Sequence, residues 1–279
     1  MKHFICELIL SCVIASPGAK PIDELTYGNV LYSYYQQDYP EALLTAMVAE
    51  AQGRTGDDPA RFKLAEGSFA FSDGMYELAR ETFQKVDPAE LTELDRMRLA
   101  FHLAREYHRR GDYADMSAEL AKIDLKSGWL GRRQYHPEVE FMRAEGAMAS
   151  GDLAGAEATL AHVDDGDPLL AYGLFNLGIA YRDAGDLDGS RRVFERLAGT
   201  RIVTGGKHPT PAETMDLVQR AKLALSFVAR EQHDTADAAG VLGGLPGDGR
   251  YRDAALASYG GLAMDNEDYE LAARIWLTL

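Results

Sequence analysis

The stretch that decides the fold runs Asn176-Leu177-Gly178-Ile179-Ala180-Tyr181-Arg182-Asp183-Ala184-Gly185-Asp186-Leu187. Small and apolar residues recur on it at helical spacing up to a Gly-Asp pair, and Ser190, Phe194 and Leu197 continue that spacing afterwards. Glycine favours the left-handed conformation that ends a helix, and an aspartate can accept hydrogen bonds from the first backbone N–H groups of the next helix. The stretch therefore predicts one helix, a tight turn and a second helix.

The same turn occurs seven times along the chain. Its first residue is aspartate in six copies, and a glycine stands before it in four copies. The seven turn residues are Asp38, Met75, Asp112, Asp152, Asp186, Asp234 and Asp268. The four preceding glycines are Gly74, Gly111, Gly151 and Gly185. We expect each aspartate to cap the second helix of its pair.

Two series of small residues keep the same register in all copies. Four residues after the turn residue come Ala42, Ala79, Met116, Ala156, Ser190, Ala238 and Ala272. Twelve residues before those come Val30, Gly67, Ala104, Ala144, Gly178, Ser226 and Gly260. Each series is small in six of seven copies, which lets two antiparallel helices approach closely. The next apolar layers are Ala46, Phe83, Leu120, Leu160, Phe194, Leu242 and Trp276, then Ala49, Val86, Ile123, Val163, Leu197, Leu245 and Leu279.

The repeat length identifies a family resemblance. Successive members of the series that begins at Ala42 lie 37, 37, 40, 34, 48 and 34 residues apart. A period near 34 with small, small, aromatic and apolar residues in this order resembles the tetratricopeptide repeat, although that family's Trp at the start of the first helix is absent from every copy. The resemblance implies an all-α, right-handed superhelical solenoid over residues 20–279. Its seven expected helix-turn-helix repeats are 22–53, 60–88, 91–124, 137–168, 169–198, 211–246 and 251–279.

The resemblance also implies a binding surface, because first helices line the concave side of such an array. An aromatic lining with a few cations suits an extended or helical peptide. The alternative is that these aromatic residues pack between neighbouring repeats. The family's carboxylate-clamp pattern of Lys and Asn is not reproduced, so a protein or peptide partner is expected without a known identity. The candidate residues are Tyr27, Tyr34, Phe71, Arg98, Phe101, Arg105, His108, Tyr172, Phe175, Arg182, Phe227 and Arg230.

The densest basic cluster consists of Arg105, His108, Arg109 and Arg110. It has two interpretations: a solvated face of a helix, or a docking point for an acidic peptide. Charge reversal of Arg105 and Arg109 would distinguish the two.

Composition limits the function classes. The formal net charge of −15 repels phosphate backbones, so we expect no nucleic-acid partner. The seven histidines show no helical three-or-four spacing, and no phosphate loop or nucleophile motif occurs. We therefore expect a protein that is not an enzyme and that holds no metal and no cofactor.

Residues 1–19 resemble a secretory signal peptide. A basic start precedes an apolar stretch interrupted by Glu7, with cleavage expected after Ala15 or Ala19. The sequence thus predicts an exported, periplasmic scaffold of the bacterial cell envelope, or a lipid-anchored one if Cys12 is lipidated. A leader that stays uncleaved would instead indicate a cytoplasmic adaptor.

Three features lie outside the regular repeat. Pro88 is expected to open a helix. The insertion 199–211 is rich in Gly and Pro and predicts a loop, after which Thr210 or Thr214 would cap a helix. Trp276 and Leu279 face inward by register with nothing after them to cover them. We expect either a longer chain, in which this would be the N-terminal module of a larger envelope or secretion protein with an active domain beyond Leu279, or a partner at this end.

Overall fold

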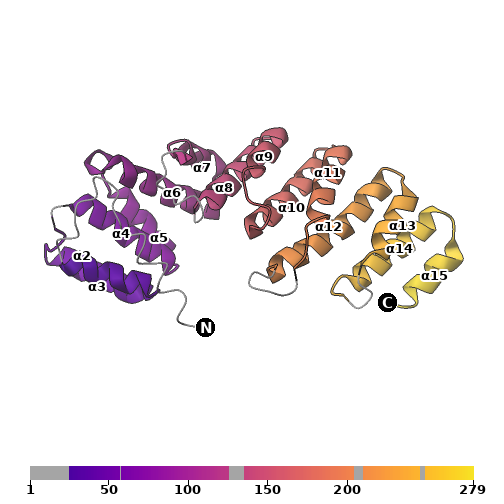
Figure 1. Ribbon diagram of the computed structural model, residues 1–279, viewed down its shortest axis with the longest axis horizontal. Coiled ribbons are helices and arrows are strands. Elements are labelled where there is room, and N and C mark those ends of the chain that lie inside the picture. The colour runs from indigo at the N-terminus through magenta and orange to yellow at the C-terminus, as the bar shows by residue number, and fades with distance from the viewer. Residues whose placement is uncertain (1–24, 57, 126–134, 204–209, 246–248) are drawn as a thin grey trace. The chain divides into compact units, whose positions relative to one another are not determined.

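The computed structural model describes residues 25–56, 58–125, 135–203, 210–245 and 249–279 (Figure 1). The predicted leader, residues 1–19, lies outside the described residues. Within the described residues the regular structure is entirely helical, which confirms the all-α class. The seven pairs of helices are α2 (Leu25–Tyr35) with α3 (Tyr39–Ala51), α4 (Pro59–Ser72) with α5 (Tyr76–Gln84), α6 (Glu93–Arg110) with α7 (Tyr113–Leu120), α8 (His136–Ala149) with α9 (Leu153–Leu160), α10 (Pro168–Asp183) with α11 (Leu187–Ala198), α12 (Ala212–Glu231) with α13 (Thr235–Gly243), and α14 (Arg252–Asp265) with α15 (Tyr269–Trp276).

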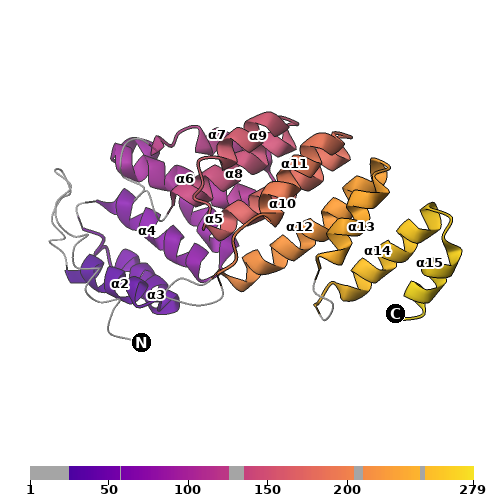
Figure 2. The same ribbon diagram turned by 45° about the vertical axis from the view of Figure 1, so that its right-hand side comes forward.

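The chain divides into two compact units. Unit 1 ends at His102 and unit 2 begins at Leu103, so α6 contributes residues to both. In unit 2 the first helix of each pair contacts the first helix of the next: α8 contacts α10, α10 contacts α12, and α12 contacts α14. Figures 1 and 2 show these hairpins following one another side by side from α8 to α15.

Each second helix begins directly after its predicted turn residue. Asp186 Oδ1 accepts a hydrogen bond from the backbone N–H of Gly189 at 2.8 Å, and Asp268 Oδ1 accepts one from Leu271 at 3.0 Å. The capping prediction is wrong at Asp112, whose side chain makes no capping bond in the structure and instead pairs with Arg110 at 3.0 Å. The aspartates that do cap are Asp38, Asp152, Asp186, Asp234 and Asp268.

The residue before each of these turns is left-handed. The four predicted glycines have φ between 76° and 84°. Three other copies place Gln37, His233 and Glu267 there, with φ of 60–63°. Left-handed φ is costly for a residue with a Cβ atom, so the turn geometry holds even where the sequence does not favour it.

The close approach of the paired helices is confirmed. All seven members of the series that begins at Ala42 are at most 1% exposed. In the α10–α11 pair, a Cβ atom on Gly178 would lie 2.6 Å from Phe194 Cε1, and Ser190 Oγ donates a hydrogen bond to the Gly178 carbonyl at 2.8 Å. A larger residue at position 178 would therefore collide with the fully buried Phe194 ring.

The last apolar layer keeps its predicted register and is largely exposed. Trp276 lies against Gly260 in the expected register, and its Nε1 donates to the Ala257 carbonyl at 3.4 Å. Its exposed fraction is nevertheless 43%, and that of Leu279 is 57%. Register fixes which way a side chain points, whereas burial also needs atoms on its other side.

Of two local predictions near loops, one is confirmed and one is wrong. Pro88 opens a helix as predicted, but it is the short 3-10 helix η2 (Pro88–Glu90), and the α-helix starts at Glu93. Neither threonine caps α12: the Thr210 hydroxyl accepts from the backbone N–H of Val203 at 2.9 Å, and Thr214 is buried. None of the described helices combines the length and the hydropathy needed to cross a bilayer.

Candidate functional site

In unit 1 the predicted surface aromatics pack between helices. The Tyr27 ring lies 5.9 Å from the Phe62 ring across α2 and α4, and the Arg61 guanidinium lies 5.4 Å from the Tyr27 ring centre. Burial raises the pKa of the Tyr27 hydroxyl above its usual value of 10.0. Tyr34 likewise lies 5.0 Å from Phe69. These contacts favour a packing role for both tyrosines.

The other candidates of unit 1 offer little free surface. Phe71 is 8% exposed and Phe101 is 2% exposed, so both rings belong to the core. Arg98 donates to the buried carboxylate of Asp95 at 2.7 Å, one turn away on the same helix. Unit 1 thus uses its candidate residues mainly for packing.

In unit 2 the predicted cations face carboxylates of the next hairpin. Arg105 on α6 pairs with Glu138 on α8 at 2.9 Å. His108 contacts Glu145 on α8, and the other oxygen of Glu145 accepts from Asn176 on α10 at 3.0 Å. Polar contacts therefore link α6, α8 and α10 in order.

The same link continues through the last three hairpins. Arg182 at the end of α10 donates from Nε to Glu231 at the end of α12, at 3.0 Å. Arg230, also at the end of α12, donates from Nη2 to Asp265 at the end of α14, at 3.1 Å. These hydrogen bonds lower the pKa of Glu231 and of Asp265 below their usual values. We call these two ion pairs the arginine links.

The carboxylates of the arginine links were missed by the sequence analysis, although the repeat register contains them. Arg182 and Arg230 each stand four residues after the small residue of their first helix, Gly178 and Ser226. Their partners stand five residues after the corresponding small residue of the following copy. The sequence signal for such a link is therefore an arginine four residues after the small residue of one first helix, together with an acidic residue five residues after the small residue of the next first helix.

An open hollow of about 590 Å³ surrounds the arginine links. Three predicted site residues meet here: Arg182, Phe227 and Arg230. The Phe227 ring is half-buried among the charged groups. The remaining lining residues are Glu231, His233 and Asp265. The arrangement offers one aromatic face and charges of both signs to a ligand.

The two predicted aromatics of α10 lie elsewhere on the helix. Tyr172 is 39% exposed. The Phe175 ring packs 5.7 Å from the buried Phe194 ring, and the Arg220 guanidinium lies 4.4 Å from its centre. Phe175 therefore bridges the core and the surface, whereas Tyr172 is the more accessible of the two.

The solved structures similar to this chain include two repeat proteins. One is a tetratricopeptide repeat protein from Parabacteroides merdae, with a TM-score of 0.51, 12% identity, and coverage of 91% of this chain and 90% of that one. The other is the C-terminal part of a repeat-containing protein of the same kind from Cytophaga hutchinsonii, with a TM-score of 0.56, 13% identity, and coverage of 90% and 92%. The chain has the tetratricopeptide-repeat fold. No family model matches it, and no curated protein sequence does so either.

The side chains of the basic cluster pair with acidic residues of the same chain. Arg109 donates from Nε and Nη2 to the buried carboxylate of Glu106, both at 3.0 Å. Arg110 pairs with Asp112 at the hairpin turn. Together with the contacts of Arg105 and His108, these pairs favour a structural role for the cluster.

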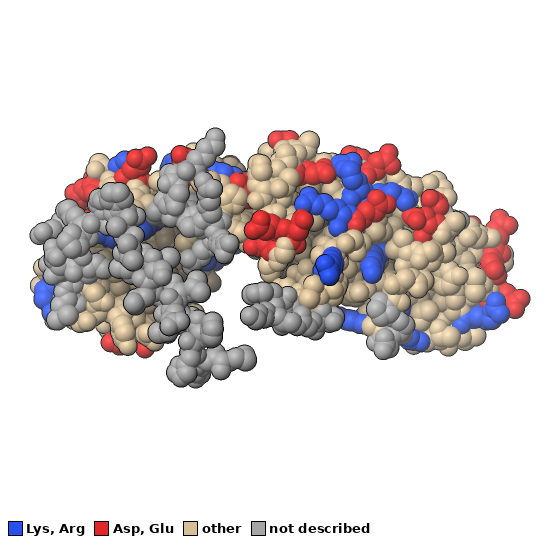
Figure 3. Space-filling view, viewed as in Figure 1, with Lys and Arg blue, Asp and Glu red and all other residues tan. Residues whose placement is uncertain are grey.

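The charge distribution agrees with the arginine links. Figure 3 shows basic and acidic side chains next to one another over α9 to α12, with neither sign forming a continuous surface there. Among the described residues, no group of three or more His, Cys, Asp or Glu has a geometry that could hold a metal ion.

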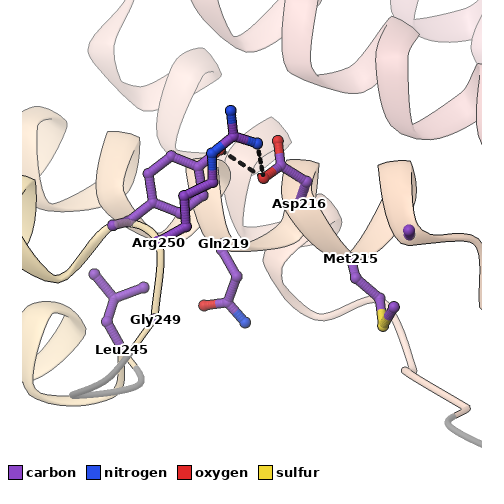
Figure 4. A pocket seen from close by; sticks show the side chains of 8 residues that line it. Met215, Asp216, Gln219, Leu245, Gly249 and Arg250 are labelled. Atoms are coloured by element: carbon purple, nitrogen blue, oxygen red, sulfur yellow. Dashed lines mark hydrogen bonds and ion pairs between the residues drawn. The ribbon is translucent and has the colours of Figure 1, made fainter.

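A second hollow of about 220 Å³ lies between the start of α12 and the segment before α14 (Figure 4). Asp216 accepts hydrogen bonds there from Tyr251 at 2.8 Å and from Arg250 at 3.2 Å. Met215 and Leu245 supply apolar walls, and the Gln219 carbonyl is buried with no hydrogen-bond partner among the described residues.

Proposed function

We propose that this protein is a binding scaffold that catalyses no reaction and that holds a polypeptide partner on the first helices of unit 2. The observation that carries the proposal is the hollow at the arginine links, which Phe227 lines together with Arg182 and Arg230. A half-buried aromatic ring among paired charges provides both contact area and directional polar groups.

The pairing of the charges specifies the partner. A purely acidic peptide would have to displace Glu231 and Asp265, and a purely basic one would have to displace both arginines. A segment with an apolar side chain flanked by one acidic and one basic residue can exchange hydrogen bonds with both links without leaving an unpaired charge. We propose that class of extended segment as the ligand.

The place of action is proposed from the leader. Residues 1–19 support export to the periplasm of a bacterial cell envelope, with lipidation of Cys12 as the membrane-anchored variant. A partner there would belong to an envelope or secretion assembly. The cytoplasmic adaptor is the competing proposal, and it requires an intact Met1.

The test is site-specific photo-crosslinking in the native host. A photoreactive phenylalanine replaces Phe227 in the full reading frame, and the matched control places it at Glu195, an exposed residue of the second helix α11. The crosslinked segment is identified by mass spectrometry and synthesised. Its binding to purified protein is then compared for wild type, Phe227→Ala and Arg182→Gln. We expect both substitutions to weaken binding at least tenfold.

Two outcomes would contradict the proposal. Equal crosslinking from Phe227 and Glu195 would show that the hollow does not select the partner. Unchanged affinity of the synthetic segment for Phe227→Ala would remove the aromatic anchor. The mature N-terminus, read in the same mass spectra, tests the location separately: processing near Ser16 or Lys20 supports export, and an intact Met1 supports the adaptor.

A further inference from the structure

A third hollow lies at the other ends of the helices, where the insertion 199–211 joins α11 to α12. Its volume is about 510 Å³, within the range of small-ligand sites. It shares no lining residue with the hollow at the arginine links. Its lining residues are Asp165, Gly166, Leu170, Ala171, Leu174, Arg196, Leu197, Gly199, Thr200, Arg201 and Thr214.

The wall from α12 holds an unused donor. Thr214 is only 6% exposed, and its hydroxyl has no hydrogen-bond partner among the described residues. Leaving a buried hydroxyl unsatisfied costs about 1–3 kcal/mol. Thr214 is one of the residues that line the hollow, so a ligand bound there would lie next to this side chain.

The opposite wall carries two arginines. Arg201 makes no ion pair within the described residues. Arg196 has one contact, at 3.6 Å, with Asp165, whose side chain is 94% exposed. That contact is long and open to water, so it contributes little. Both guanidinium groups are available to an anion.

Hydrogen bonds join Val203 to Thr210, close in sequence to Arg201. The Thr210 backbone N–H donates to the Val203 carbonyl at 2.8 Å, and the Val203 N–H donates to the Thr210 hydroxyl at 2.9 Å. These two bonds join the segment that carries Thr200 and Arg201 to the start of α12. The two polar walls of the hollow are therefore held together.

Charge and polarity select the ligand. The two arginines and Asp165 leave one net positive charge on the lining, which matches a single negative charge better than two. Leu170, Leu174 and Leu197 give the hollow an apolar side. We propose that it binds a monocarboxylate joined to an apolar group, with the carboxylate on Arg196, Arg201 and the Thr214 hydroxyl.

Two sources could supply that chemistry: a free amphiphilic acid, or the carboxyl terminus of a polypeptide that ends in an apolar residue. Isothermal titration of the full chain with octanoate tests the first. Titration with a short peptide ending in leucine, and with its C-terminal amide, tests the second. Octanol, acetate and octyl phosphate serve as controls for the charge, the apolar part and the anion type.

We expect octanoate, the free-acid peptide, or both to bind, and acetate, octanol and the amide to bind at least tenfold more weakly. Arg201→Gln and Arg196→Gln should each lower the affinity about tenfold or more. Arg192→Gln is the matched control on α11, because Arg192 pairs with Glu157 and does not line the hollow. It should leave the affinity unchanged.

Thr214→Val gives the sharpest test because its two effects have opposite signs. Removing an unsatisfied hydroxyl should keep or raise the melting temperature of the ligand-free protein, yet weaken carboxylate binding roughly threefold to tenfold. Thr159→Val is the control, because the Thr159 hydroxyl donates to the Gly155 carbonyl at 2.8 Å. Thr159→Val should not change the affinity.

The proposal is overturned if neither octanoate nor the free-acid peptide binds at millimolar concentration. It is also overturned if octanol binds as well as octanoate, or if octyl phosphate binds more tightly. Unchanged affinity in Arg201→Gln and Thr214→Val would place any bound carboxylate elsewhere and would overturn it equally.

Discussion

The fifth hairpin, α10–α11, and the seventh, α14–α15, follow one pattern and differ in what surrounds it. Both have a capping aspartate, Asp186 and Asp268, and both set a large ring on the glycine that stands sixteen residues earlier in the chain. Phe194 is fully buried in the fifth hairpin, whereas Trp276 in the seventh is 43% exposed. The repeat pattern therefore builds the hairpin, and the neighbouring hairpin supplies the burial.

The largest expected difference lies in the ring itself. Phe194→Ala should lower the free energy of unfolding by about 3–5 kcal/mol, because it empties a fully enclosed site. Trp276→Ala should cost less than about 2 kcal/mol despite the larger side chain, because much of the ring already meets water. Urea denaturation followed by circular dichroism measures both, and equal losses would contradict the comparison.

The glycine under the ring gives the next effect. Gly178→Ala should cost about 1–3 kcal/mol, since the new Cβ atom meets a Phe194 ring that cannot move away. Gly260→Ala should cost less, because Trp276 can shift toward solvent. The control is Gly240→Ala inside α13, where no atom lies within 4 Å of the new Cβ, and which should raise stability by about 0.5–1 kcal/mol. A loss of stability in Gly240→Ala would contradict open space beside this position.

The residue before the turn residue gives a smaller effect on stability, of opposite sign in the two hairpins. Gly185 has φ of 80°, so Gly185→Ala should lower stability by about 1 kcal/mol. Glu267 has φ of 60° at the same place, and Glu267→Gly should raise stability by about 0.5–1 kcal/mol. Melting temperatures measured side by side check the signs. A stabilising Gly185→Ala would show that the left-handed turn is not required.

The smallest effect concerns the arginine link between the fifth and sixth hairpins. Both side chains are about 40% exposed, so Arg182→Gln should lower stability at pH 7 by only about 0.2–1 kcal/mol. The hydrogen bond from Arg182 lowers the folded-state pKa of Glu231 below its usual 4.5. The contribution of this ion pair to the stability of the folded protein is therefore complete above pH 4.5, and it is lost as the pH falls through the lower folded-state pKa of Glu231.

Denaturation of wild type and Arg182→Gln across this pH range measures the loss directly. The difference between the two proteins should shrink as the pH falls below 4.5. A difference that stays constant with pH would contradict the link. Arg192→Gln provides a comparison within α11, since Glu157 also has a pKa lowered by a hydrogen bond from its arginine partner.

The hairpins could be predicted from the sequence because their signals are local. Gly185, Asp186 and Gly178 each act within one pair of helices, and spacing alone brings Gly178 under Phe194. Asp112 shows the limit of this reasoning, because Arg110 competes for the carboxylate that would otherwise cap α7. Trp276 shows another, because burial depends on atoms outside its own repeat.

The candidate site was predicted only in part. The family resemblance identified Arg182, Phe227 and Arg230, but the contacts of Glu231 and Asp265 depend on how successive hairpins align across steps of 48 and 34 residues. The hollow at Thr214 depends on where residues 199–201 lie, and these residues follow no period. A composition rich in Gly and Pro predicts a loop but not where its arginine lies.

The arginine links also have a consequence for how such a chain can grow. The sixth hairpin carries Glu231, which receives a link from the hairpin before it, directly beside Arg230, which gives one to the hairpin after it. If this hairpin were duplicated in tandem, Arg230 of the first copy could pair with Glu231 of the second copy. The original neighbours would keep their partners, since Arg182 would still meet a Glu231 and Asp265 would still meet an Arg230. The sixth hairpin is thus a self-compatible unit at which the array can lengthen by duplication without any new charge having to evolve.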